Sequence, residues 1–232
     1  MEQAKYENVA LPTCLFFRMR KIYFVYLPPV YDLMNTMMNP EVANELIQRR
    51  RSIYPPLYSG QRVDDAVIEQ MLENANWAPT HALTEPWRFT VFSDDGLRQL
   101  ADFQSGLYQK VKTEEGTFDE KKYKKLKEKP LLCSHIISIG MKRDPKRKIP
   151  EVEEVEATAC AVQNMYLTAT AYGVGCYWGS GGITYLPQAK AFFGLEEEDK
   201  LLGFLYIGMP KAGKWPEGRR KPIADKVKWV RA

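Results

Sequence analysis

Two hydrophobic periods divide this chain of 232 residues into predicted helices and strands. Apolar residues spaced three and four apart predict amphipathic helices, which begin at Asn39 or Pro40, at Asp64 or Asp65, near Asp94 or Asp95, and at Pro187. Residues 152–172 are apolar on more than one stripe, which is typical of a long helix buried against several partners.

Strands are predicted where the apolar pattern is alternating or continuous. Residues 87–92 alternate between apolar and polar, whereas residues 131–141 and 201–207 are continuously apolar. No repeat or flexible linker interrupts residues 38–232. Helices and strands mixed in this way predict one α+β domain, with helices packed on a single sheet.

Residues 1–37 differ from the rest of the chain. Basic residues and a proline pair interrupt their aromatic-rich stretch, so no apolar run is long enough to span a membrane. Charges inside the apolar region also argue against a secretory signal peptide. Met37 and Met38 directly precede the first predicted helix. We therefore expect residues 1–37 to be an extension, disordered or upstream of the true start, ahead of a domain over residues 38–232.

The composition argues against several classes of function. Hydrophobic residues make up 45% of the chain and charged residues 27%, enough for a folded core. The 33 basic and 29 acidic residues give a net charge of +4 with interspersed signs, which does not favour a nucleic-acid partner. Four cysteines without a CxxC motif and two histidines predict neither a disulfide framework nor a metal site.

Two basic groups lie near opposite ends of the predicted domain. Arg49, Arg50 and Arg51 with Ser52 offer guanidinium forks and a hydroxyl to a phosphate dianion, although a surface cluster has the same pattern. The second group, residues 219–221, converges on the same anion only if the fold brings the two ends together.

Three further segments carry candidate chemistry. Residues 78–87 join a helix to a strand through two prolines, which fix the backbone of this loop. The loop either binds a planar heterocycle through its backbone N–H and C=O groups or only stiffens the connection. Residues 173–182 are rich in glycine but fail the dinucleotide fingerprint, because Trp178 replaces its third glycine. A glycine-rich turn with Trp178 as an aromatic wall still suits a ligand. The lysine-rich residues 110–129 predict a solvated helix or flap, or alternatively a mobile cover over an anionic ligand.

Taken together and in order, these segments resemble the nitroreductase family of FMN-dependent oxidoreductases over about residues 39–230. The resemblance rests on five motifs: Arg50-Arg51-Ser52, Ala78-Pro79-x-His81 followed by Pro86-Trp87-x-Phe89, Trp178-Gly179-Ser180-Gly181, Leu202–Gly208, and Arg220-Lys221-Pro222. The Pro-x-His form and the short chain look most like the compact branch of the family.

The resemblance implies an α+β homodimer with a central, mostly antiparallel sheet and two FMN sites at the subunit interface. The residues expected to hold the flavin phosphate and ribityl side are Arg50, Arg51, Ser52 and Arg220. Those expected along the flavin borders are Trp77, Pro79, Thr80 and His81 from the partner chain, and Trp178, Gly179, Ser180 and Gly181. The sequence departs from the family at Glu85, a pyrimidine-side position where glutamine is common, and at Gly179, where relatives carry a polar residue.

The resemblance also implies ping-pong turnover, in which NAD(P)H reduces bound FMN and an electron-poor nitroaromatic or quinone is then reduced over the same flavin face. Because FMN would carry the hydride chemistry, we expect no catalytic side chain. The alternatives are a specialised enzyme of this fold (a dehalogenase, a desaturase or a flavin-fragmenting enzyme), a non-catalytic flavin-binding protein, and an interaction module without a cofactor. We expect a cytoplasmic protein with a small-molecule acceptor and without a nucleic-acid or membrane partner.

Overall fold

An antiparallel sheet forms the centre of the computed structural model, which describes residues 39–231. The strands of this sheet are β1 (Trp87–Ser93), β2 (His135–Met141), β3 (Gly175–Gly179) and β4 (Lys200–Gly208). They lie in the order β1-β2-β4-β3, and neighbouring strands of this sheet are antiparallel. Every residue of the central strand β2 is buried. The predicted α+β fold with a mostly antiparallel sheet is confirmed.

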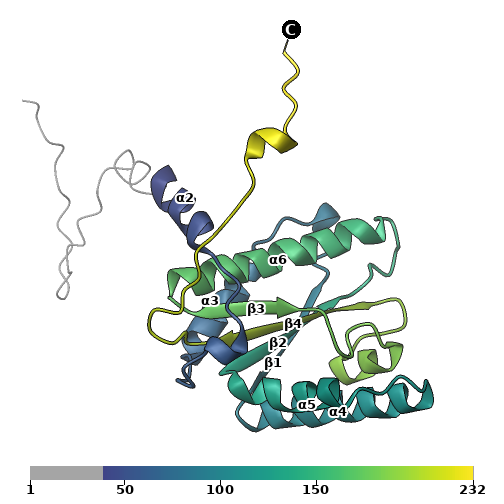
Figure 1. Cartoon of the computed structure of the whole chain (residues 1–232). Coiled ribbons are helices and arrows are strands. Elements are labelled where there is room, and N and C mark those ends of the chain that lie inside the picture. The colour runs from purple at the N-terminus through teal and green to yellow at the C-terminus, as the bar shows by residue number, and fades with distance from the viewer. Residues whose placement is uncertain (1–38, 232) are drawn as a thin grey trace, which may run out of the picture. The chain divides into compact units, whose positions relative to one another are not determined.

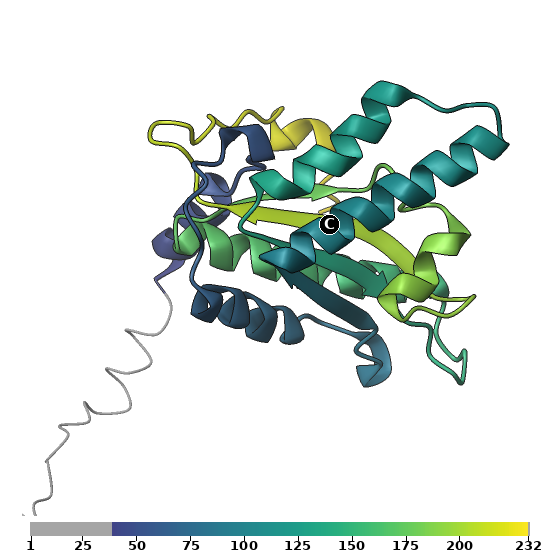
Figure 2. The ribbon, with the colours of Figure 1, turned by 90° about the horizontal axis from the view of Figure 1, so that it is seen from below.

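Helices cover both faces of the sheet (Figure 1, Figure 2). α3 (Asp65–Asn76) and α6 (Glu151–Ala171) pack on one face, and α4 (Asp95–Glu114) and α5 (Glu120–Glu128) lie on the other. Successive strand side chains point to opposite faces. Ile137 and Leu205 therefore join the core with α3 and α6, whereas Ile136 and Phe204 join the core with α4.

Further described helices lie outside these two pairs. They are α2 (Pro40–Arg49) and the 3₁₀ helices η1 (Pro55–Leu57), η2 (His81–Leu83), η3 (Lys129–Leu132), η4 (Pro187–Phe193) and η5 (Ile223–Lys226). η4 begins at the predicted proline and is followed by its C-cap residue Gly194, whose backbone is left-handed. No described helix is long and apolar enough to cross a bilayer.

Aspartates mark the predicted helix starts, but in two different ways. The side chain of Asp64 accepts a hydrogen bond from the Ala66 backbone N–H at 3.0 Å and so caps α3. α4 begins at Asp95 without a side-chain cap, because the Asp94 carboxylate accepts two hydrogen bonds from Arg62 Nη1, at 2.8 and 2.9 Å.

Two predicted elements differ from the structure. The strand expected over residues 131–141 begins only at His135, because η3 occupies residues 129–132 and its Pro130 has no N–H for a strand ladder. The glycine-rich segment expected to be a turn contains β3, which pairs with β4 along its whole length. Without β3, that edge of β4 would expose unpaired backbone groups, so the sheet overrides the low strand propensity of glycine.

Gly203 permits the close approach of β3 and β4. Its φ is 124°, a conformation that side chains rarely adopt, and a Cβ at this position would clash with the carbonyl oxygen of Gly179. The register of β4 against β2 shifts between Ile139 and Gly140, directly opposite. Glycine at residue 203 is therefore a requirement of this sheet edge.

The end of the described chain joins neither core. All residues from 217 to 231 are exposed, and Figure 1 shows this segment running away from the sheet. Residues 40–231 belong to one compact unit. The extension expected over residues 1–37 lies outside the described residues.

Candidate functional site

The end of β3 separates two hollows that lie on opposite faces of the sheet. Because strand side chains alternate, Trp178 packs with the core under α3 and α6, whereas Tyr177 packs with the core under α4. The hollow on the Trp178 face we call the arginine groove, and that on the Tyr177 face the lysine–tyrosine groove. Each is built from residues far apart in the sequence.

The arginine groove has a volume of about 460 Å³. Its lining residues are Arg50, Ser52, Val155, Tyr166, Trp178, Ser180, Tyr185 and Leu202. The Arg50 guanidinium lies 5.2 Å from the centre of the Tyr166 ring. Tyr166 is itself fixed, because its hydroxyl accepts a hydrogen bond from the Trp178 backbone N–H at 2.6 Å.

Arg50 is positioned to bind an anion. No carboxylate among residues 39–231 forms an ion pair with it, whereas its neighbour Arg49 pairs with Glu45 at 3.2 Å. The backbone of Ser52 forms an isolated parallel β-bridge with Cys176 of β3. This pairing holds Ser52 at the lining of the same groove. An unpaired guanidinium beside a hydroxyl is a donor set that suits a phosphate.

Arg51, by contrast, binds the C-terminal segment of its own chain. Its Nε donates to the Pro216 carbonyl at 3.1 Å, and its Nη1 donates to the Arg50 carbonyl at 2.7 Å. The Trp215 indole donates to the Arg49 carbonyl at 2.9 Å. The fold therefore brings residues 215 and 216, which shortly precede the second basic group, beside the first basic group. Arg220 follows four residues after Pro216, and its guanidinium is exposed.

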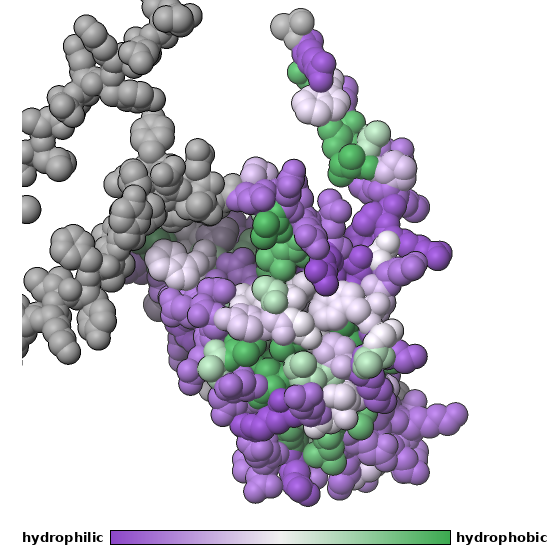
Figure 3. Space-filling view, turned by 90° about the vertical axis from the view of Figure 1, so that its left-hand side faces the viewer, coloured by the Kyte–Doolittle hydropathy of each residue, from purple (hydrophilic) through white to green (hydrophobic). Residues whose placement is uncertain are grey.

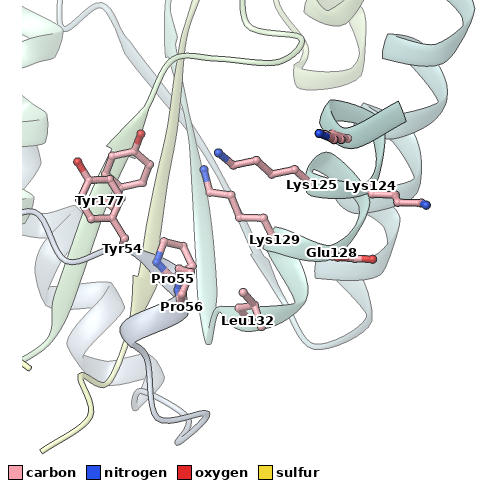
Figure 4. Close-up of a pocket in the computed structure, with 10 residues that line it drawn as sticks. Tyr54, Pro55, Pro56, Lys124, Lys125, Glu128, Lys129, Leu132 and Tyr177 are labelled. Atoms are coloured by element: carbon pink, nitrogen blue, oxygen red, sulfur yellow. The ribbon is translucent and has the colours of Figure 1, made fainter. Parts of the chain in front are cut away.

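The lysine–tyrosine groove lies between α5 and the sheet (Figure 4). It consists of two hollows of about 640 and 430 Å³, and Lys121, Lys125, Lys129 and Tyr177 line both. Tyr54 lines the first hollow, and its ring centre lies 4.4 Å from that of Tyr177.

Lys129 is the most enclosed lysine of this groove. Its Nζ lies 3.6 Å from the centre of the Tyr206 ring and 4.8 Å from that of Tyr177. Burial lowers the pKa of Lys129 to about 8. The sequence predicts Lys129 only as part of the lysine-rich residues 110–129 and predicts no role for Tyr54 or Tyr177. The spacing of four between Lys121, Lys125 and Lys129 is the signal that marks one helical face.

The expected run from Trp178 to Gly181 divides between the two grooves. Trp178 and Ser180 line the arginine groove, whereas Gly179 and Gly181 line the lysine–tyrosine groove. Nothing lies within 4 Å of where a Cβ of Gly181 would be, so a ligand has access to the backbone there.

The expected residues from Trp77 to Glu85 line neither groove of their own chain. Trp77 is 78% exposed and borders a separate hollow between α3 and α6, and Pro79 and Glu85 are also exposed. A hydrogen bond of 2.5 Å joins His81 Nδ1 to Glu153 Oε2, and the Thr80 hydroxyl accepts from the Glu85 backbone N–H at 3.2 Å.

The backbone of this loop is strained. Ala82, Leu83 and Glu85 have positive φ values of 48°, 54° and 43°, although none of them is glycine. Such conformations cost free energy and concentrate at ligand sites. The loop is thus held in a defined shape while its side chains remain exposed.

Two of the described cysteines are buried, and the described residues contain no cluster of metal ligands. Burial raises the pKa of Cys133 to about 12 and also raises that of Cys176, so both thiols stay protonated near neutral pH. No group of three His, Cys, Asp or Glu side chains within residues 39–231 could hold a metal ion.

Known proteins are similar to this chain in sequence and in fold. The model of the nitroreductase family matches residues 47–209. The Escherichia coli (strain K12) protein YdjA, assigned as an NAD(P)H nitroreductase, is 31% identical over 172 residues, which cover 73% of this chain and 88% of YdjA. Human iodotyrosine deiodinase 1 is 28% identical over 199 residues, which cover 77% of this chain and 65% of that protein.

Solved structures agree with these relatives. A nitroreductase-like protein from Bacillus cereus has a TM-score of 0.70 and 30% identity, over 84% of this chain and 98% of its own. A protein from Desulfovibrio desulfuricans, assigned as a nitroreductase and solved in complex with FMN, has a TM-score of 0.62 and 24% identity over 84% and 99% of the two chains. By sequence and by fold, this chain belongs to the nitroreductase family.

Proposed function

We propose that this chain is a cytoplasmic, homodimeric, FMN-dependent NAD(P)H oxidoreductase that reduces nitroaromatics, quinones or similar electron-poor acceptors by ping-pong hydride transfer. Family membership and the assignment of YdjA as an NAD(P)H nitroreductase support this proposal. The observation that carries it is the Arg50 guanidinium beside Ser52, which has no ion-pair partner among residues 39–231. Lys129 is enclosed at the same strand end, on the opposite face of the sheet.

The donor set fits the parts of FMN. Arg50 and Ser52 would hold its phosphate, and Arg220 follows a segment that is tied to the same place by Arg51. Because the two grooves flank the end of β3, an edge strand, an FMN held by both would pass around that end, where Tyr177, Gly179 and Gly181 offer an aromatic wall and open backbone to a planar ring. The FMN complex of the Desulfovibrio protein supports the same cofactor in this fold.

Bound FMN would supply the hydride chemistry, so the side chains bind, orient and stabilise charge. Lys129 has the clearest role, because an ammonium with a pKa of about 8 remains mostly protonated at neutral pH. In its half-buried position, this charge would stabilise negative charge that develops on a neighbouring ring during reduction.

A second copy of the chain would complete the site. No residue of α2 is buried, and Val42 and Ile47 on this helix are 62% and 56% exposed. Trp229 in the C-terminal segment is 76% exposed. Figure 3 shows apolar and weakly polar side chains gathered in the middle of one face, with hydrophilic side chains around them. Such a surface is typical of an interface.

The loop with His81 supports the same assembly. It is strained and exposed and lines no groove of its own chain, so we propose that it borders the flavin of the partner subunit. The C-terminal segment with the exposed Trp229 would belong to the same interface. Deleting residues 223–232 should therefore produce a monomer with weakened FMN binding, measured by light scattering and by flavin content.

The direct test is to purify the full-length protein, measure its flavin absorbance and follow NADH and NADPH oxidation with a nitroaromatic and with a quinone. A yellow protein with acceptor-dependent oxidation is expected. A protein that neither copurifies with FMN nor binds added FMN contradicts the proposal, and flavin binding without turnover indicates a carrier.

Similarity to iodotyrosine deiodinase 1 favours reductive dehalogenation as a second candidate function. Iodide release from iodotyrosine by the reduced protein tests this candidate. If iodide release is faster than nitroaromatic reduction, the second candidate replaces the first.

A further inference from the structure

The lysine–tyrosine groove holds more positive charge than Lys129 alone supplies. Lys121, Lys125 and Lys129 are spaced four residues apart and therefore lie on one side of α5 and its continuation into η3. Each of them lines both hollows of the groove. At a rise of about 1.5 Å per residue, Lys125 and Lys121 lie roughly 6 and 12 Å along the helix from Lys129.

Two other lysines on α5 form ion pairs, whereas these three form none within residues 39–231. Lys124 pairs with Glu120 at 3.4 Å and Lys127 pairs with Asp102 at 3.7 Å. In the described part of the chain, no carboxylate forms an ion pair with Lys121, Lys125 or Lys129.

One acid lines each hollow, Glu128 in the first and Asp119 in the second, and four lysines outnumber it in each. In Figure 4, Lys125 and Lys129 extend toward Tyr54 and Tyr177, while Glu128 points away. The Asp119 carboxylate accepts hydrogen bonds from the first backbone N–H groups of α5, at 2.8 and 3.3 Å, as its N-cap. The wall that α5 contributes to the groove therefore has a net positive charge.

The opposite wall is aromatic. The rings of Tyr54 and Tyr177 are 4.4 Å apart, and those of Tyr177 and Tyr206 are 5.8 Å apart and nearly parallel. Tyrosine rings stack with planar apolar groups, and ammonium groups attract anions. A molecule that satisfies both walls is a planar aromatic with a negatively charged substituent.

We propose that Lys121 and Lys125 bind the anionic substituent of the electron acceptor, so that the enzyme prefers aromatic acceptors carrying a carboxylate, sulfonate or phosphate. This inference rests on the proposed function. Lys129 stabilises negative charge on the reacting ring, and Lys121 and Lys125 bind the negatively charged substituent of the acceptor. The lysine-rich segment is thereby a specificity element rather than only a solvated helix.

The test compares two acceptors that differ in charge, 4-nitrobenzoate and its uncharged analogue 4-nitrobenzamide. FMN-loaded, full-length wild-type protein and the K121Q/K125Q variant are assayed with both acceptors. We expect the variant to lose roughly five- to thirtyfold in kcat/KM for 4-nitrobenzoate and less than about twofold for 4-nitrobenzamide. Comparing variant with wild type cancels the difference in intrinsic reactivity between the acceptors.

The matched control is K110Q/K127Q, which removes the same charge from lysines that do not line the groove. It should keep the wild-type ratio between the two acceptors. Calorimetric titration with 4-nitrobenzoate, in the absence of NAD(P)H, measures binding without turnover. The affinity should fall in K121Q/K125Q and, for wild type, between 0.1 and 1 M salt, because the Debye length shortens from about 10 to about 3 Å.

Three results would overturn the inference. One is an equal loss of kcat/KM with both acceptors, and another is an unchanged affinity for 4-nitrobenzoate in K121Q/K125Q. The third is a rise in KM confined to NADH or NADPH, which would assign the lysines to the coenzyme. Failure of the proposed function is distinguishable, because a protein without flavin or turnover can still bind 4-nitrobenzoate in the titration.

Discussion

Replacing Arg50 with alanine should weaken FMN binding far more than it weakens the fold. The guanidinium lies 5.2 Å from the centre of the Tyr166 ring and has no ion-pair partner among residues 39–231. In the protein without FMN, the substitution removes only this cation–π contact, which is worth roughly 0.5–1 kcal/mol at an exposed site. The melting temperature should therefore fall by only about 1–4 °C.

The loss in binding is larger because a phosphate contact is charge-assisted. Such a contact contributes about 1.5–3 kcal/mol, which corresponds to a rise in Kd of roughly 10- to 150-fold. Titrating FMN with apoprotein and following the quenching of flavin fluorescence measures this Kd. Circular dichroism melting of the same apoproteins measures the effect on stability.

Arg49→Ala provides the control, because this substitution removes the same charge from the preceding residue. Its side chain is 70% exposed and pairs with Glu45 on α2 rather than lining the groove. Arg49→Ala should leave the Kd for FMN within about twofold of wild type. If Arg50→Ala binds FMN as tightly as wild type, or if both variants lose equally, the assignment of Arg50 to the phosphate is wrong.

Three further predictions follow from buried groups and from the sheet. Burial lowers the pKa of Lys129 to about 8, so the rate of flavin reduction should fall above about pH 8. Lys129→Arg keeps its charge at this pH and should remove the decline, which stopped-flow absorbance measures. Burial lowers the pKa of His135 in the folded protein, so this histidine binds its proton at a higher pH in the unfolded chain than in the folded one. The free energy of unfolding should therefore fall as pH drops below about 6.5. Urea unfolding of His135→Gln should show less of this fall, and an identical pH dependence would contradict the reasoning. Gly203→Ala should cost about 2–5 kcal/mol in the free energy of unfolding through backbone strain and a clash, whereas Gly106→Ala, in open space within α4, should cost nothing.

Much of the fold follows from local sequence. α3 begins after the capping Asp64, and α6 occupies residues 151–171, close to the predicted 152–172. The strand at residues 87–93 and the strand at 200–208 also match their apolar patterns. These elements were predictable because caps and periodicity act between residues a few positions apart.

The candidate site was predictable in its residue types but not in its arrangement. Arg50 and Arg51 are adjacent in sequence, yet one lines the groove and the other binds the carbonyl of Pro216. Trp178 and Gly179 are likewise neighbours on opposite faces of β3. A motif names these residues together, whereas strand alternation and a contact 165 positions away decide where each one points.

By itself, the sequence determined the family, the α+β class, most element boundaries and the residue types of the proposed phosphate site, because each depends on local patterns and ordered motifs. Only the tertiary structure decided that β3 is a strand, that Lys129 is enclosed by tyrosines with a lowered pKa, and that lysines of α5 line the groove beside these tyrosines. The burial of a side chain, and hence the electrostatic free energy of its charge, depends on neighbours contributed by distant strands and helices. A one-dimensional pattern does not contain that information.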